Sequence, residues 1–131
     1  MHRKHRGSLS ELIACAWLLE QGFEVFRNVS QHGIADLVVW RKGGFPRLLD
    51  VKTISYSRKS QSTPFQTISC SVPDQRQVSE NVLYVYVCQL SNKAGFNPYE
   101  LANAAGIVVT QKQLDRWQSV GVAQLALMDA A

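Results

Sequence analysis

The chain of 131 residues has no long hydrophobic run. No apolar stretch approaches the ~20 residues that a membrane-spanning helix needs. The apolar segment at residues 12–19 follows a basic start and lacks a small-residue cleavage site. It therefore predicts a core helix rather than a signal peptide. No internal repeat or linker is visible, so we expect one domain without a membrane partner.

Cysteine is also scarce. Cys15, Cys70 and Cys88 are odd in number, lie far apart and lack the spacing of metal ligands. This pattern argues against a disulfide-stabilised secreted domain and against a zinc site. Reduced thiols in a cytoplasmic protein are the simplest interpretation.

Charge is modest in amount but uneven along the chain. With 46% hydrophobic and 18% charged residues, the composition is that of a soluble globular protein and not of a disordered one. Residues 1–60 carry ten Lys or Arg and five Asp or Glu, a net charge of +5, whereas residues 61–131 carry four and five, a net charge of −1. A basic surface attracts polyanions and favours nucleic acid as a partner. A solvated surface that aids solubility is the alternative.

The predicted elements run in the order helix, three strands, short helix, strong strand. Residues 1–6 predict a flexible basic arm and residues 7–131 a single domain. A helix over residues 8–21 begins with Ser8 and Glu11 as a capping box. Strands are expected at residues 24–27, 34–41 and 47–53, the last two forming a hairpin around Gly43 and Gly44. Their near-continuous apolar character predicts a sheet covered on both faces.

The second half of the chain is less regular. Residues 55–71 predict a long polar loop, residues 73–78 a short helix, and residues 82–90 a buried strand. Residues 92–103 are expected to be irregular, and residues 106–109 are a strand candidate. Thr110 and Gln113 predict the start of a helix that ends near residue 119. The pattern over residues 122–128 fits either a strand or a helical tail.

Three ionisable residues lie where charge is costly. Asp36 lies within the apolar stretch at residues 34–40, and Asp50 and Lys52 follow the next apolar run. A buried carboxylate without a partner costs several kcal/mol, so buried acids usually form ion pairs or bind a metal ion. Two acids and a lysine on adjacent strands predict a site that binds a divalent cation and acts on phosphate esters.

The turn between the two strands decides whether these side chains meet. A two-residue loop pairs Lys42 with Phe45 and puts Asp36 on the wrong face relative to Asp50. A three-residue loop pairs Lys42 with Pro46, which sets Asp36 opposite Lys52 and on the face of Asp50. A catalytic site therefore predicts an odd-length turn or a bulge.

Two further groups are candidates for the same site. A backbone carbonyl, for instance that of Val51, is a candidate for a further metal ligand. Glu11 lies on an apolar side of the first helix, from which its carboxylate could reach the metal. The alternative is that Glu11 caps the helix by bonding to the backbone of Ser8. Phosphate contacts are predicted for five basic residues, namely Arg3, Lys4, Arg6, Arg58 and Lys59.

The order of motifs along the chain resembles the PD-(D/E)XK nuclease superfamily, through Gly7-x-x-x-Glu11, Gly33-Ile34-Ala35-Asp36 and Asp50-x-Lys52. The order of elements is similar to the αβββαβ core of that restriction endonuclease-like α/β fold, a mixed sheet flanked by helices. Two positions depart from the motif. Ala35 stands where proline is often found, and Asp50 replaces the commoner glutamate.

The resemblance implies roles for the named residues. Asp36 and Asp50 would be metal ligands, Lys52 the catalytic lysine, and Glu11 the acid that many members carry on the first helix. It also implies Mg²⁺ as cofactor, with Mn²⁺ able to substitute, DNA as partner, and a homodimer or higher homo-oligomer. Within the superfamily, the small size and basic surface of the chain make it most similar to Holliday junction resolvases and to small phage or intron endonucleases. The resemblance implies that the protein works inside a prokaryotic, archaeal or phage-infected cell, in the cytoplasm.

The expected function is therefore a Mg²⁺-dependent DNA endonuclease that hydrolyses phosphodiester bonds, with branched DNA among its candidate substrates. Two alternatives stay open. One is a nuclease-like protein that binds nucleic acid or assembles without turnover. The other is an unrelated α/β domain in which Asp36, Asp50 and Lys52 form a structural ion pair.

Overall fold

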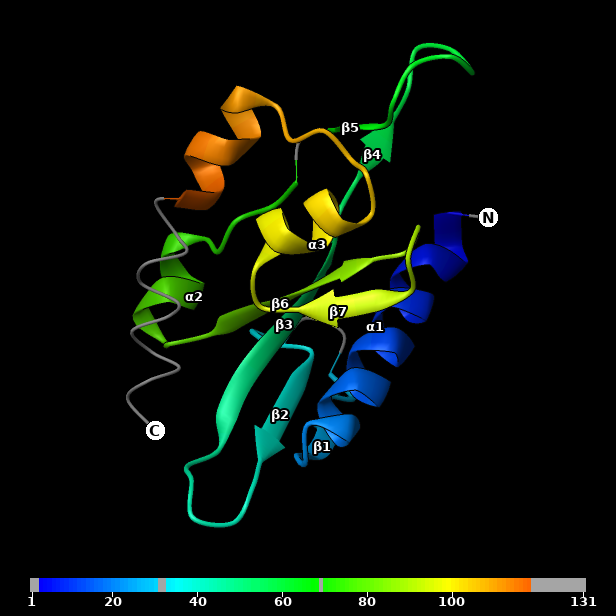
Figure 1. Ribbon diagram of the computed structural model, residues 1–131. Coiled ribbons are helices and arrows are strands. Elements are labelled where there is room, and N and C mark those ends of the chain that lie inside the picture. Colours follow the sequence, from blue (N-terminus) through cyan, green and yellow to red (C-terminus); the bar gives the residue numbers. More distant parts are fainter. Residues whose placement is uncertain (1–2, 31–32, 69, 119–131) are drawn as a thin grey trace.

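A computed structural model describes residues 3–30, 33–68 and 70–118 (Figure 1). A mixed β-sheet lies at its centre and helices pack on it. The elements in chain order are α1 (Arg3–Glu20), β1 (Glu24–Arg27), β2 (Leu37–Trp40), β3 (Arg47–Thr53), β4 (Tyr56–Ser57), β5 (Gln66–Thr67), α2 (Gln75–Ser79), β6 (Leu83–Cys88), β7 (Lys93–Gly95) and α3 (Pro98–Ala104). Residues 111–118 are also helical. No helix in this part of the chain is both long and apolar enough to cross a membrane.

The central sheet has five strands in the order β1-β2-β3-β6-β7. Strands β1, β2 and β3 form an antiparallel meander, β6 runs parallel to β3, and β7 returns antiparallel to β6. The parallel pairing of β3 with β6 needs a crossover, which the segment holding α2 supplies. This is the predicted αβββαβ arrangement, and the α/β fold class is confirmed.

One face of the sheet is covered by α1, which packs against β1, β3, β6 and β7. Side chains alternate along a strand, so Leu37, Leu49 and Val85 point to this face together. They are fully buried against Ala14 and Leu18 of the helix. The apolar sector of α1 is therefore what fixes the helix on the sheet.

The opposite face is covered only in part. Tyr84 and Tyr86 of β6 pack there with Trp117, which comes from the helix at residues 111–118. Cys70 and Cys88 are buried in the same cluster as free thiols. Over β1 and β2 this face is more open. The prediction of a sheet covered on both faces therefore holds for β6 and β7, which α1 and α3 cover, but not for β1 and β2.

The first helix begins earlier than its sequence signal indicates. It begins at Arg3, so residues 3–6, predicted as a flexible arm, are helical. Ser8 and Glu11 consequently lie inside the helix, where the preceding turn already bonds their backbone groups. The predicted capping box at Ser8 is wrong.

Other differences fall in the polar second half. The predicted loop at 55–71 contains the β4–β5 hairpin, and the predicted irregular segment at 92–103 contains β7 and α3. Asn97 caps α3, with its side chain accepting from the N–H of Glu100, and Pro98 follows at the first turn. The strand candidate at 106–109 forms only an isolated bridge at Val108. Residues 122–128 lie outside the described part of the chain.

The packing of α1 gives a direct stability test. Replacing Leu18 with alanine should lower the free energy of unfolding by about 2–5 kcal/mol, because the side chain is 0% exposed in the core. Its neighbour Leu19 is 59% exposed, so Leu19→Ala is the matched control and should cost less than about 1 kcal/mol. Urea denaturation measures both, and equal losses would contradict this packing of the helix.

Candidate active site

The register of β2 against β3 brings the two predicted acids together. Leu37 pairs with Leu49, and the N–H of Asp36 donates to the carbonyl of Leu49 at 3.0 Å. The paired ladder ends at Leu37 and Leu49, and Asp36 lies just beyond it, where its side chain forms a hydrogen bond with that of Asp50. Asp50 alternates with Leu49 along β3, so the carboxylate of Asp50, and that of Asp36 beside it, lie on the side of the sheet that α1 does not cover.

The connection between these strands has an odd length. It comprises residues 40–46, between the paired Val39 and Arg47. The predicted odd-length turn is confirmed, but the predicted pairing of Lys42 with Pro46 is wrong. The observed pairs are centred on Gly43 and not on Gly44, and Gly43 adopts a φ of +88°, a left-handed conformation that glycine takes without strain. Asp36 is therefore beside Asp50 and not opposite Lys52.

The Asp36 carboxylate is held close to Asp50. Its Oδ2 accepts a hydrogen bond from the N–H of Val51 at 2.7 Å. Partial burial, a side-chain hydrogen bond to Asp50 and the negative charges of Asp50 and Glu11 together raise the pKa of Asp36 to about 6, although the Val51 N–H opposes this shift. The raised pKa indicates that negative charge is crowded here.

Lys52 offsets part of that charge. Its Nζ lies 3.1 Å from Oδ2 of Asp50 and 5.3 Å from the centre of the Tyr84 ring. Asp50 is 7% exposed, whereas the side chain of Lys52 is 32% exposed. The buried acid is therefore paired with an ammonium group that solvent, or a substrate, can still reach.

Gln77 of α2 joins the same cluster, and sequence reasoning missed it. Its Nε2 donates to Oδ2 of Asp50 at 3.0 Å and to the carbonyl of Ile34 at 3.2 Å. Its Oε1 accepts from the Tyr84 hydroxyl at 2.6 Å and from the N–H of Asp74 at 3.2 Å. All the hydrogen-bonding positions of the amide are filled, which fixes its orientation.

A signal for Gln77 was present in the sequence. Asp74 followed three residues later by Gln77 is a capping box, and both of its hydrogen bonds are formed at the start of α2. The short helix thus presents the amide to the sheet. Sequence reasoning could have found this cap, but not the contact that Gln77 makes with Asp50.

Glu11 and Val51 have different surroundings from those predicted. The Glu11 carboxylate accepts from Nε of Arg27 at 2.8 Å, in an ion pair whose arginine side chain is 59% exposed. Its charge still contributes to the raised pKa of Asp36. Val51 contacts the site through its N–H; a role for its carbonyl stays a prediction. Across residues 3–30, 33–68 and 70–118, no three Asp, Glu, His or Cys side chains gather closely enough to hold a metal ion.

Three of the basic residues predicted to contact phosphate, Arg6, Arg58 and Lys59, lie near the end of β3 or in the hairpin that follows it. Arg6 of α1 donates to the Ser55 hydroxyl at 3.3 Å, just before β4. Arg58 and Lys59 are exposed in the loop that joins β4 to β5. Three of the five predicted residues are thus tied to one region of the fold. The side chains of Arg3 and Lys4 lie outside what the structure describes.

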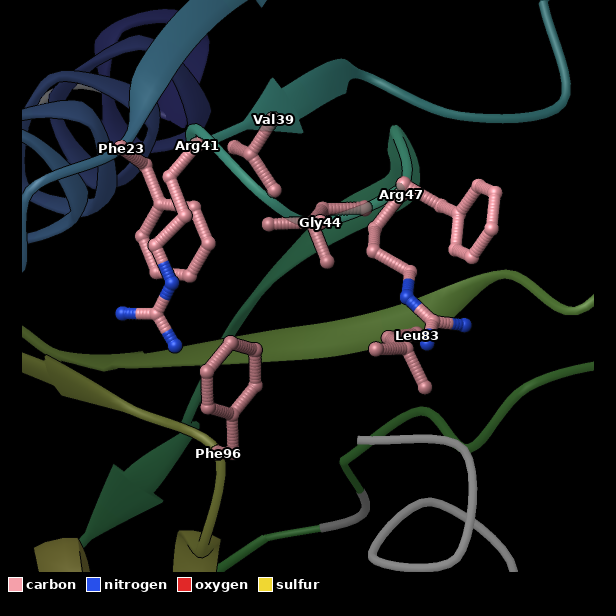
Figure 2. Close-up of a pocket in the computed structure, with 9 residues that line it drawn as sticks. Phe23, Val39, Arg41, Gly44, Arg47, Leu83 and Phe96 are labelled. Carbon is pink, nitrogen blue, oxygen red and sulfur yellow. The ribbon is translucent and has the colours of Figure 1, made fainter. Parts of the chain in front are cut away.

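A hollow of about 110 Å³ lies on the other side of the sheet (Figure 2). Phe23, Phe96 and Leu49 line it together with two arginines, and the Arg41 guanidinium stacks over the Phe23 ring at 4.6 Å. Because Leu49 belongs to the core beneath α1, this hollow faces away from Asp50. It is therefore separate from the carboxylate cluster.

A second hollow, of about 190 Å³, lies beside the carboxylates. Phe26, Val38 and Leu48 line it, and Phe26 is 55% exposed. Val38 is two residues from Asp36 and so shares its face. The carboxylates therefore stand at the border between an open apolar surface and the packed cluster around Tyr84.

The donor set fits a hard divalent cation. Mg²⁺ prefers oxygen ligands, keeps several of its waters, and is commonly held by one or two carboxylates together with substrate phosphate. Asp36 and Asp50 supply two such groups on one face, and their crowding raises the pKa of Asp36. A cation between them would relieve this repulsion.

Comparisons with known proteins agree with this geometry. A model of the family described as PD-(D/E)XK endonuclease matches residues 1–122. The fold is similar to that of a bacterial homing endonuclease, I-Ssp6803I, with a TM-score of 0.53 and 16% sequence identity over 99% of each chain. No curated protein matches the chain.

Removing the crowded charge should stabilise the metal-free protein. The pKa of Asp36 is about 6 in the folded protein and 3.8 ordinarily. Between pH 3.8 and pH 6 the folded state therefore binds more protons than the unfolded state, so the free energy of unfolding falls as pH rises through this range. In EDTA at pH 8, Asp36→Asn should therefore raise the free energy of unfolding by on the order of 1 kcal/mol after solvent screening.

Thermal unfolding of both proteins between pH 4 and pH 8 measures this difference. The advantage of Asp36→Asn should shrink as pH falls towards 4. Asp115→Asn, at an exposed acid of the last described helix, is the control and should give no such trend. A wild type that stays the more stable protein at pH 8 would contradict the crowding of the two carboxylates.

Loss of the Gln77 amide should also be measurable. Gln77→Ala leaves Oδ2 of Asp50 and the Tyr84 hydroxyl each without one partner, so the free energy of unfolding should fall by about 1–3 kcal/mol. Gln75→Ala changes an exposed residue of the same helix and should cost less than about 0.5 kcal/mol. Similar losses in the two variants would show that Gln77 acts only through its helix.

Proposed function

The chain belongs to the PD-(D/E)XK endonuclease family, and we propose that it hydrolyses phosphodiester bonds of DNA with Mg²⁺ as cofactor. One observation supports this proposal above the others. The side chains of Asp36 and Asp50 meet on one side of the sheet, and Lys52 forms an ion pair with Asp50. An acidic pair beside an ammonium group suits a cation and a phosphate that meet at one place.

In this proposal Asp36 and Asp50 hold the cation, with the Val51 carbonyl as a further ligand and Mn²⁺ able to replace Mg²⁺. The bound ion supplies positive charge that stabilises the phosphate as negative charge develops during hydrolysis. The N–H of Val51 and the amide of Gln77 orient the two carboxylates.

Lys52 is the proposed catalytic lysine. Its partly exposed ammonium group is fixed by Asp50 and stands ready to orient the attacking water or to stabilise charge on the phosphate. Glu11 is proposed as an additional acid of the site. An exposed ion pair contributes at most about 1 kcal/mol, so the pair with Arg27 opens at little cost.

DNA is the proposed substrate, bound through phosphate contacts from the basic residues near β4. Branched DNA is one candidate, from the similarity to junction resolvases. One site of this kind cuts one strand, so cleavage of both strands favours a symmetric dimer with paired sites. A nuclease-like protein that binds DNA without cutting it is the alternative, and the experiment below distinguishes the two.

Replacing Lys52 with methionine should lower Mg²⁺-dependent DNA cleavage by about 100-fold or more, because a positioned charge at the reacting phosphate is lost. Binding of the same DNA should stay within about 3-fold of the wild type, since phosphate contacts elsewhere supply most of the affinity. Cleavage is measured on linear duplex, single-stranded and four-way junction DNA, with Mg²⁺, Mn²⁺ or EDTA.

Lys112→Met is the matched control, because Lys112 is an exposed lysine on the helix at residues 111–118. It should cut as the wild type does. Circular dichroism confirms that each variant is folded. Wild-type protein that binds these DNAs but cuts none of them with either metal would favour the binding protein, and full activity in Lys52→Met would exclude the proposed role of this lysine.

A further inference from the structure

The β4–β5 hairpin extends away from the body of the protein beyond the end of β3 (Figure 1). Residues 57–64, which form its outer part, are all exposed. Arg58 and Lys59 lie there among Ser, Thr and Gln, and no Asp or Glu occurs between residues 51 and 73. The hairpin is thus a cationic, polar projection with no apolar side chain at its end.

The base of the hairpin is fixed to the body. The N–H of Ile68 donates to the carbonyl of Ser55 at 2.8 Å, which closes the two strands. Val108 exchanges backbone hydrogen bonds with the second strand, donating to Phe65 at 2.8 Å and accepting from Thr67 at 3.0 Å. The hairpin therefore has a set direction relative to the sheet that carries the carboxylates.

The tip has its own internal order. The N–H of Ser60 donates to the Thr63 hydroxyl at 3.1 Å, and that hydroxyl donates to the carbonyl of Ser60 at 3.0 Å. Arg58 stacks over the Phe65 ring at 4.7 Å and donates to Oε1 of Gln61 at 3.1 Å. These bonds shape an exposed turn that buries nothing, so they serve to hold its polar groups in place rather than to stabilise a core.

Duplex DNA is the partner that this shape and charge fit. The major groove, about 12 Å wide, admits a two-stranded β-ribbon, and glutamine pairs with the edge of adenine there. Gln61 follows Asp50 by 11 residues (61 − 50 = 11), which span at most about 40 Å. That reach corresponds to about 12 base pairs at 3.4 Å each.

We propose that the β4–β5 hairpin enters the major groove of duplex DNA, where Gln61 contacts a base and Arg58 and Lys59 contact phosphates. The base that Gln61 reads lies within about 12 base pairs of the cut. This inference rests on the proposed nuclease function and adds sequence preference to it. It assigns recognition to the hairpin and cleavage to the carboxylate cluster.

Selection of bound sequences from a randomised duplex library tests the hairpin. The Lys52→Met protein is used with Mg²⁺ present, so that bound DNA keeps its full length. Adding Gln61→Ala should erase the preference at one base-pair position, a loss of about 5- to 150-fold in discrimination. Adding Arg58→Ala should weaken binding to all sequences and reduce the salt slope by about one.

Gln21→Ala provides the matched control, because Gln21 is exposed just after α1 and far along the chain from the hairpin. It should leave the selected motif intact. An unchanged motif in Gln61→Ala, selected DNA without any sequence preference, or an absence of duplex binding would each overturn the proposal.

Cleavage of the selected duplex by the chain with Lys52 intact separates the two proposals. If that DNA is cut while Gln61→Ala keeps its motif, only the hairpin proposal fails. If Gln61 sets the motif but the DNA is never cut with Mg²⁺ or Mn²⁺, the hairpin proposal stands and the proposed hydrolysis fails.

Discussion

Repulsion between the carboxylates of Asp36 and Asp50 is the constraint around which this site is arranged. Asp36 lies at the end of the β2–β3 ladder, where its side chain meets that of Asp50. Buried acids without partners cost several kcal/mol. Three groups offset that cost, namely the N–H of Val51, the ammonium of Lys52 and the amide of Gln77. They compensate only in part, since the pKa of Asp36 stays near 6. The remaining repulsion is what a bound cation would remove.

The two faces of the sheet have different roles, one in stability and the other in the proposed chemistry. The face beneath α1 is an apolar core, whereas the other face carries the acids at the border between packed aromatic rings and an open surface. Strand β3 belongs to both, because Leu49 points to the core and Asp50 to the site. The same strand leads into the hairpin. A change in its register would therefore move the core, the acids and the proposed DNA-reading tip together.

The sequence was most informative in segments where burial and the alternation of side chains along a strand restrict which residues can occur. The strands, the α/β class and the shared face of Asp36 and Asp50 follow from apolar runs and from the parity of the turn. The exact register did not follow, because the pairing is centred on the left-handed Gly43 and not on Gly44. The contact of Gln77 with Asp50 escaped prediction because it joins segments distant in the chain. The β4–β5 hairpin escaped because its paired strands are only two residues long and polar in part. Glu11 was predicted to cap its helix or to bind the metal. Its observed partner is Arg27 of β1, which becomes a neighbour only when the chain folds.

The proposed chemistry requires that Asp36 and Asp50 together hold one divalent cation. Binding of Mn²⁺ by the metal-free protein at pH 7.5 can be followed by electron paramagnetic resonance. We expect one bound ion in the wild type, and binding weakened by about 10-fold or more in both Asp36→Asn and Asp50→Asn. Equal Mn²⁺ binding by the wild type and the two variants would contradict it.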